Sequence, residues 1–121
     1  MKVTIYQKPT CTTCRRVFAS LKESGVALES VDYYVDPIPK AKLKELLRKM
    51  GMKARDLLRT KEEIYKRLKL AVRQVSDEEI VDLMVKYPDL IQRPIVEKGD
   101  RAILARPAER LKEIMGEQRH A

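Results

Sequence analysis

The chain has 121 residues, which suits a single domain and leaves little room for two. Hydrophobic residues make up 44% of it, enough for one core, and because aromatic residues are only 5%, aliphatic side chains must fill that core. The formal net charge of +8 favours acidic partners such as nucleic acid, an anionic protein surface or a small oxyanion. The positive residues are spread from Lys2 to Arg119, however, and fit a solvated basic surface equally well. No nucleic-acid-binding motif with interleaved aromatic residues is visible, so direct binding of RNA or DNA is not expected.

The N-terminal segment, Met1–Pro9, resembles a short strand followed by polar residues and not a signal peptide. No stretch approaches the roughly 18 apolar residues that a membrane span needs. We therefore expect a cytoplasmic protein without a membrane segment, in a compartment that keeps thiols reduced. A metal site is not expected either, because zinc prefers about four ligands and the single histidine is His120, beside the C-terminus.

The first third of the chain predicts a strand, a helix and a second strand. Lys2–Tyr6 is rich in β-branched residues and predicts a strand, which the turn Gln7–Thr10 follows. Apolar residues at helical spacing predict a helix over about Thr12–Ser24, ended by Gly25. Ala27–Tyr33 predicts the second strand. This order is a βαβ unit with a right-handed crossover.

The middle of the chain predicts helices. Apolar residues at helical spacing predict four helices. They lie at Leu43–Met50, ended by Gly51, near Ala54–Leu58, near Lys61–Leu68, and from a capping box at Ser76–Glu79 to Val85. Pro88 closes the last of them.

The end of the chain predicts a β-hairpin and a helix. Pro94–Glu97 and Arg101–Leu104 are the two hairpin strands. Pro107 is placed in the first turn of the final helix, and the last residues, Glu117–Ala121, should be frayed. The whole order predicts an α/β protein with a thioredoxin-like fold and a mixed four-stranded sheet. One domain should span residues 1–121, with a helical insert at about 39–88 between its two halves.

The sequence Cys11-Thr12-Thr13-Cys14 lies where the first strand gives way to the first helix. The unpaired N–H groups and the dipole of a helix start both stabilise an anion. Together with Lys8, Arg15 and Arg16, they should lower the pKa of Cys11 and make it the nucleophile. Cys14, one turn later and better buried, could then attack a mixed disulfide on Cys11. Half of a zinc site or two chance thiols are the alternatives, and the missing ligands favour redox chemistry.

Four motifs follow one another along the chain: TIYQKPTCTTCRR at Thr4–Arg16, LLR at Leu57–Arg59, IQRPIV at Ile91–Val96 and ILARP at Ile103–Pro107. Together they resemble the arsenate reductase family of thioredoxin-fold proteins, whose superfamily also includes the Spx regulators that bind RNA polymerase. The resemblance covers nearly the whole chain, including the lengths between the motifs.

The resemblance implies that Cys11 attacks arsenate while Arg59, Arg93 and Arg106 bind its oxygens. Guanidinium groups match the oxygen edges of a tetrahedral anion, and their charge stabilises both the thiolate and the negative thiol–arsenate adduct. Arg59 taken alone would be interpreted as a solvated helix residue. The resemblance also implies a cis-proline opposite the cysteine, at Pro94.

Two positions depart from the enzymes, which usually carry Ser in place of Cys14 and often His in place of Gln7. With Cys14 present, an internal Cys11–Cys14 disulfide becomes available. We expect no bound cofactor, and an external thiol reductant: thioredoxin, or glutathione with glutaredoxin. The substrate implied is a small oxyanion such as arsenate, and the protein should be a monomer.

Two other functions stay open. An Spx-like redox regulator that binds RNA polymerase would also use a Cys-x-x-Cys pair as its switch. A general thiol–disulfide reductase is the third alternative. Arg106 and the short connection Met50-Gly51-Met52 are features of the enzymes and not of the regulators, so the enzyme is preferred.

Overall fold

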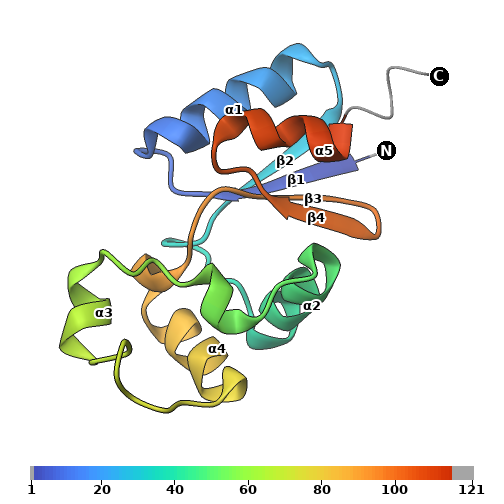
Figure 1. Ribbon diagram of the computed structural model, residues 1–121. Coiled ribbons are helices and arrows are strands. Elements are labelled where there is room, and N and C mark those ends of the chain that lie inside the picture. The colour runs from blue at the N-terminus through green and yellow to red at the C-terminus, as the bar shows by residue number, and fades with distance from the viewer. Residues whose placement is uncertain (1, 116–121) are drawn as a thin grey trace. The chain divides into compact units, whose positions relative to one another are not determined.

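The computed structural model describes residues 2–115, and the predicted frayed end Glu117–Ala121 and His120 lie outside them. The elements, in chain order, are β1 (Lys2–Gln7), α1 (Thr12–Glu23), β2 (Ala27–Asp32), α2 (Lys40–Met50), the 3₁₀ helix η1 (Ala54–Leu57), α3 (Glu63–Arg67), α4 (Asp77–Lys86), η2 (Pro88–Leu90), β3 (Ile95–Lys98), β4 (Arg101–Leu104), η3 (Ala108–Leu111) and α5 (Lys112–Met115). Figure 1 labels the helices and strands that carry the argument below.

The four strands form one mixed sheet in the order β2-β1-β3-β4. β1 pairs with β2 in parallel, from Lys2 opposite Ala27 to Gln7 opposite Asp32. β3 is antiparallel to both β1 and β4, and β3 and β4 are the predicted hairpin. The predicted α/β fold with a mixed four-stranded sheet is therefore confirmed.

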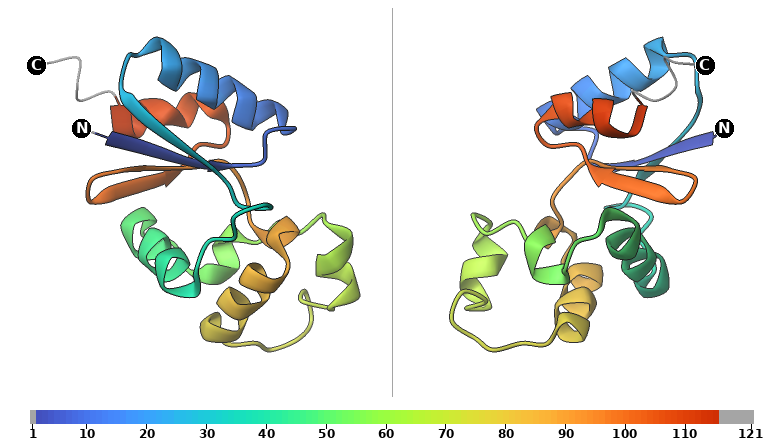
Figure 2. Two further views of the ribbon diagram at one scale, coloured as in Figure 1. Left: turned by 180° about the vertical axis from the view of Figure 1, so that it is seen from behind. Right: turned by 45° about the vertical axis from the view of Figure 1, so that its right-hand side comes forward.

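The hydrophobic core around the sheet lies between one of its faces and two helical segments, α1 and η3–α5. Val3 and Ile5 alternate along β1 and point to that face, because strand side chains have a period of two. They pack with Val17 and Leu21, one turn apart on α1, and with Ile114 of α5. Figures 1 and 2 show α1 and α5 side by side on the same face of the sheet.

The chain divides into two compact units. Residues up to Asp36 and from Arg93 onward form the first, which contains the sheet, and Pro37–Gln92 form the second. In the second unit α4 packs against α2, η1 and η2. Its N-cap Ser76 accepts a hydrogen bond from the Glu79 amide at 3.1 Å, as a capping box requires. That the whole chain folds as one domain stays a prediction.

Several boundaries differ from the sequence predictions. The stretch predicted as a helix at Ala54–Leu58 is a 3₁₀ turn, and the one at Lys61–Leu68 is helical only over Glu63–Arg67. Pro107 is the N-cap of η3 and not part of the helix, because its extended backbone (ψ 167°) precedes the first helical residue. β2 ends at Asp32, one residue before Tyr33. Short segments such as these are decided by tertiary contacts more than by propensity.

No helix within residues 2–115 has the length and apolar character needed to cross a membrane.

Candidate functional site

Cys11 is the N-cap residue of α1. Its extended backbone lets the sulfur turn back over the first helical turn, where Sγ accepts a hydrogen bond from the Cys14 amide at 3.4 Å. A tight turn holds the loop before it, since the Cys11 amide donates to the Lys8 carbonyl at 2.9 Å. Cys11 is partly exposed and Cys14 is fully buried, as the sequence predicts.

The surroundings of Cys11 lower the pKa of its thiol to about 7. Partial burial acts in the opposite direction, because it disfavours the charged form. Hydrogen bonds from the Cys14 amide, the Cys14 thiol and the Arg93 guanidinium outweigh it, and the charge of Arg93 adds to them. About half of the Cys11 thiol is then ionised at neutral pH, against about 3% for an ordinary cysteine.

Cys14 has the opposite character. Burial raises the pKa of its thiol to about 12, and the neighbouring Cys11 sulfur adds to the rise through a hydrogen bond and its charge. The Lys8 backbone and Arg93 oppose the rise without cancelling it. Cys14 is therefore a protonated thiol at neutral pH, chiefly because it is buried, and the neighbouring Cys11 sulfur reinforces this.

Arg93 is the cation that acts on Cys11. It lies two residues before the start of β3, the Arg93–Pro94 peptide bond is cis, and only 9% of the residue is exposed. Its Nη1 donates to the Tyr34 hydroxyl at 3.3 Å. Its Nε is buried and has no hydrogen-bond partner among residues 2–115. A buried charged donor without a partner is costly, so this atom is suited to an anion from outside the protein.

Arg106 lies beside Arg93 at the same end of the hairpin. Its Nη1 donates to the Arg93 carbonyl at 3.2 Å, and the Ala105 amide donates to the Pro94 carbonyl at 2.9 Å. Both arginines precede a proline in a cis peptide bond. Arg106 is exposed, whereas Arg93 is buried.

Arg59 belongs to the second unit. Its amide donates to the Leu90 carbonyl at 2.8 Å, next to an antiparallel bridge between Leu58 and Ile91. Its guanidinium forms an ion pair with Glu62, with Nη2 at 3.1 Å from the carboxylate. The convergence of Arg59 on Cys11 stays a prediction.

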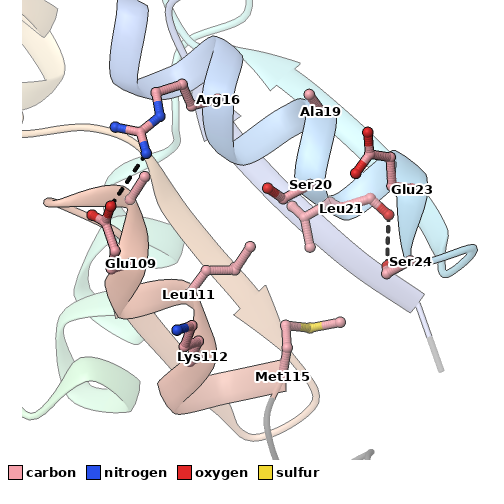
Figure 3. Close-up of a pocket in the computed structure, with 11 residues that line it drawn as sticks. Arg16, Ala19, Ser20, Leu21, Glu23, Ser24, Glu109, Leu111, Lys112 and Met115 are labelled. Atoms are coloured by element: carbon pink, nitrogen blue, oxygen red, sulfur yellow. Dashed lines mark hydrogen bonds and ion pairs between the residues drawn. The ribbon is translucent and has the colours of Figure 1, made fainter.

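The basic residues close to Cys11 in sequence have other partners. Arg15 donates to the Pro9 carbonyl, and Lys8 lies over the ring of Tyr34, 4.7 Å from its centroid. Arg16 pairs with Glu109 at 3.2 Å, where it lines a cavity of about 740 Å³ between α1 and the η3–α5 segment (Figure 3). That cavity does not include Cys11. The prediction that these three residues stabilise the thiolate is therefore corrected in favour of Arg93.

Tyr33 and Tyr34 are part of this environment, and the sequence reasoning overlooked them. Their rings lie 5.1 Å apart, and Tyr34 contacts both Lys8 and Arg93. A usable signal was present: parallel strands end at the same edge of a sheet, so residues after β2 must lie near those after β1.

Gln7, which replaces the His of the enzymes, is buried at the end of β1 and donates to the Ser30 hydroxyl at 2.6 Å. Within residues 2–115, no group of three or more His, Cys, Asp or Glu side chains is placed to hold a metal ion.

Alkylation should modify Cys11 long before Cys14. The ionisation of a thiol sets its reactivity, so the rate of modification by iodoacetamide should rise to half its maximum near pH 7. Peptide mapping after limited alkylation at pH 6 measures which cysteine carries the label, with the urea-unfolded chain as control. Preferential modification of Cys14 would reverse the two roles.

The ArsC family model matches residues 6–114. The uncharacterized protein YfgD of Escherichia coli K12 is 42% identical over 116 residues, which are 95% of this chain and 98% of that protein. An arsenate reductase of the same strain is 35% identical over 113 residues, or 93% of this chain and 80% of that enzyme.

A solved structure of an arsenate reductase is also similar to this chain. The arsenate reductase from Vibrio cholerae superposes with a TM-score of 0.89 at 36% identity, covering 94% of this chain and 98% of the other. The likeness therefore extends over most of both chains.

Proposed function

Because the chain belongs to the ArsC family, we propose that it is a thiol-dependent enzyme that reduces arsenate or a closely related oxyanion, with Cys11 as its nucleophile. The observation that carries the proposal is the pairing of a half-ionised Cys11 thiol with Arg93, whose buried Nε lacks a partner. A nucleophile and an anion-binding donor on adjacent groups are what attack on an oxyanion requires.

Arg93 and Arg106 are proposed to bind the oxyanion. Two guanidinium groups joined through the Arg93 carbonyl present fixed charge at one edge of the sheet, and neither is neutralised by a carboxylate within residues 2–115. Arg59 is proposed as the third ligand on the strength of the family resemblance, and would exchange its Glu62 partner for the substrate.

The proposed reaction begins when the Cys11 thiolate attacks the arsenic atom of arsenate. A sulfur–arsenic bond forms, and one arsenic oxygen leaves as water after protonation. A second thiol then attacks the Cys11 sulfur, and the electrons of the sulfur–arsenic bond pass to arsenic. Two thiols are thereby oxidised to one disulfide, and As(V) is reduced to As(III) as arsenite.

Cys14 is proposed to supply that second thiol. Burial and the Cys11 thiolate together hold its pKa at about 12. Once Cys11 is bonded to arsenic, the contribution of its thiolate disappears and Cys14 ionises more readily. An external thiol reductant, thioredoxin or glutathione with glutaredoxin, would then reduce the disulfide. No bound cofactor enters this scheme, and we propose that the protein acts in the cytoplasm, where such reductants are kept reduced.

Mild oxidation should give an internal Cys11–Cys14 disulfide. Cys14 lies one helical turn after Cys11, with its amide bonded to the Cys11 sulfur, so the two side chains begin close together. Mass spectrometry after stoichiometric peroxide should show a monomer lighter by two hydrogens, and the Cys14→Ser variant should not show this loss of mass. A persistent Cys11 sulfenic acid in the parent protein would contradict the assignment of Cys14.

The function itself is tested by measuring arsenite formation from arsenate, with the thioredoxin and glutaredoxin systems supplied side by side. Turnover with thioredoxin supports Cys14 as the internal thiol, whereas turnover with glutaredoxin alone supports an external one. No arsenite in either system would overturn the proposal.

The Spx-like regulator is the second candidate, because its Cys-x-x-Cys switch is present in Cys11 and Cys14. It requires binding to RNA polymerase, which a pull-down with reduced and oxidised protein measures. Redox-dependent capture of the polymerase together with failure to reduce arsenate would place this function first.

A further inference from the structure

We propose that Tyr34 is a positioning residue that holds the Arg93 guanidinium against Cys11. The proposal rests on the proposed function, in which Arg93 stabilises the thiolate and binds the oxyanion. Tyr34 comes two residues after the end of β2, where none of the family motifs lies.

Two contacts join Tyr34 to Arg93. The Tyr34 hydroxyl accepts a hydrogen bond from Nη1 at 3.3 Å, and Cζ of the guanidinium lies 5.9 Å from the centre of the ring. Arg93 is also among the groups that lower the pKa of the Cys11 thiol, through hydrogen bonding and through its charge. With Nη1 held by Tyr34, the group has a fixed orientation, and its Nε remains unpartnered.

A phenol suits this role better than a carboxylate would. Within residues 2–115 Arg93 forms no ion pair, so its full charge is available to the thiolate and to an incoming anion. An Asp or Glu in place of Tyr34 would hold the guanidinium equally well but would cancel that charge. Tyr34 therefore fixes the direction of the arginine without neutralising it.

Tyr34 is itself held from several directions. Its amide donates to the Asp32 carboxylate at 3.1 Å, and its ring packs against Tyr33, which is buried. Lys8 lies over the ring at 4.7 Å from its centroid. Because β1 and β2 are parallel neighbours, Lys8 after one strand and Tyr34 after the other meet at the same edge of the sheet. This support is what a positioning residue needs.

The decisive experiment is a double-mutant cycle read out on Cys11 and not on turnover. The pKa of Cys11 is measured from the pH dependence of its alkylation in the full-length parent, Tyr34→Phe, Arg93→Gln and the combined variant. Tyr34→Phe keeps the ring and removes only the hydroxyl. Tyr87→Phe is the matched control, since it removes a phenol hydroxyl from the second unit. Thermal unfolding checks that each variant is folded.

We expect Tyr34→Phe to lower the alkylation rate of Cys11 at pH 6 by about three- to tenfold. This is less than the effect of losing a charged hydrogen bond outright, because the guanidinium stays in place and only its orientation is loosened. In the Arg93→Gln background the same change should alter the rate less than about twofold, because the guanidinium it positions is absent. Tyr87→Phe should match the parent.

Two results would overturn the proposal: a Tyr34→Phe protein that alkylates like the parent, or an equal effect with and without Arg93. If the coupling is present but neither arsenate nor sulfate binds, the role of Tyr34 stands and the proposed function fails. The two claims are thus separated by one set of variants.

Discussion

Cys11→Ser should reduce arsenate reduction to the rate of the protein-free reaction. The proposed chemistry requires a thiolate that bonds to arsenic and then leaves as half of a disulfide, and a serine hydroxyl is neither ionised at neutral pH nor able to form that disulfide. Arsenite formed per minute under saturating reductant is the measurement. Oxyanion binding, followed by calorimetry, should be nearly unchanged, because the arginines are intact.

Cys14→Ser is the matched control for this experiment. It removes the second sulfur of the same motif but keeps Cys11 at the helix N-terminus, so it should lose turnover with thioredoxin and keep turnover with glutathione and glutaredoxin. Residual thioredoxin-dependent activity in Cys11→Ser would mean that another group is the nucleophile.

Arg93→Ala is expected to have the next largest effect. It removes the cation whose hydrogen bond and charge help to lower the pKa of Cys11, so that pKa should rise from about 7 toward the ordinary thiol value. It also removes the unpartnered Nε, and losing a charged hydrogen bond to an oxyanion costs about 1.5–3 kcal/mol. Arsenate or sulfate should therefore bind about ten- to a hundredfold more weakly.

Arg15→Ala is the control for charge alone. Arg15 is one residue after the motif and exposed, and its Nε donates only to the Pro9 carbonyl. The same unit of charge is lost, but the pKa of Cys11 and the binding of oxyanions should change little. If Arg15→Ala and Arg93→Ala behave alike, general surface charge attracts the anion and the proposed site at Arg93 is wrong.

Local features of the site could be predicted from the sequence because short-range rules govern them. Cys11 is at the start of α1 because Pro9 and the turn before Cys11 interrupt the strand. In the same way Gly51 ends α2, with a left-handed φ of 67° that suits glycine. The neighbouring positions of Arg93 and Arg106 follow from a rule of the same kind, because the two outer ends of a hairpin are neighbours.

The cation that acts on Cys11 could not be found in this way. Lys8, Arg15 and Arg16 are near Cys11 along the chain, but the contacts of a side chain depend on the folded structure and not on distance along the sequence. Arg93 reaches Cys11 only because β3 pairs with β1 in a sheet, which joins residues some eighty positions apart. Tyr34 was overlooked for the same reason, since its contact with Arg93 depends on the parallel pairing of β1 with β2.

The two neighbouring arginines differ in burial, and salt will therefore act on them differently. Dissolved ions screen charges over about 8 Å at physiological ionic strength, but they screen a buried charge much less than an exposed one. Arg106, at the surface, should draw anions toward the site mainly when salt is low. Arg93, with 9% of its surface exposed, should keep its hold on the Cys11 thiolate in concentrated salt. The long-range attraction of an anion by Arg106 should therefore weaken as the ionic strength rises, whereas the contacts of Arg93 with the Cys11 thiolate and with a bound anion should depend on it much less.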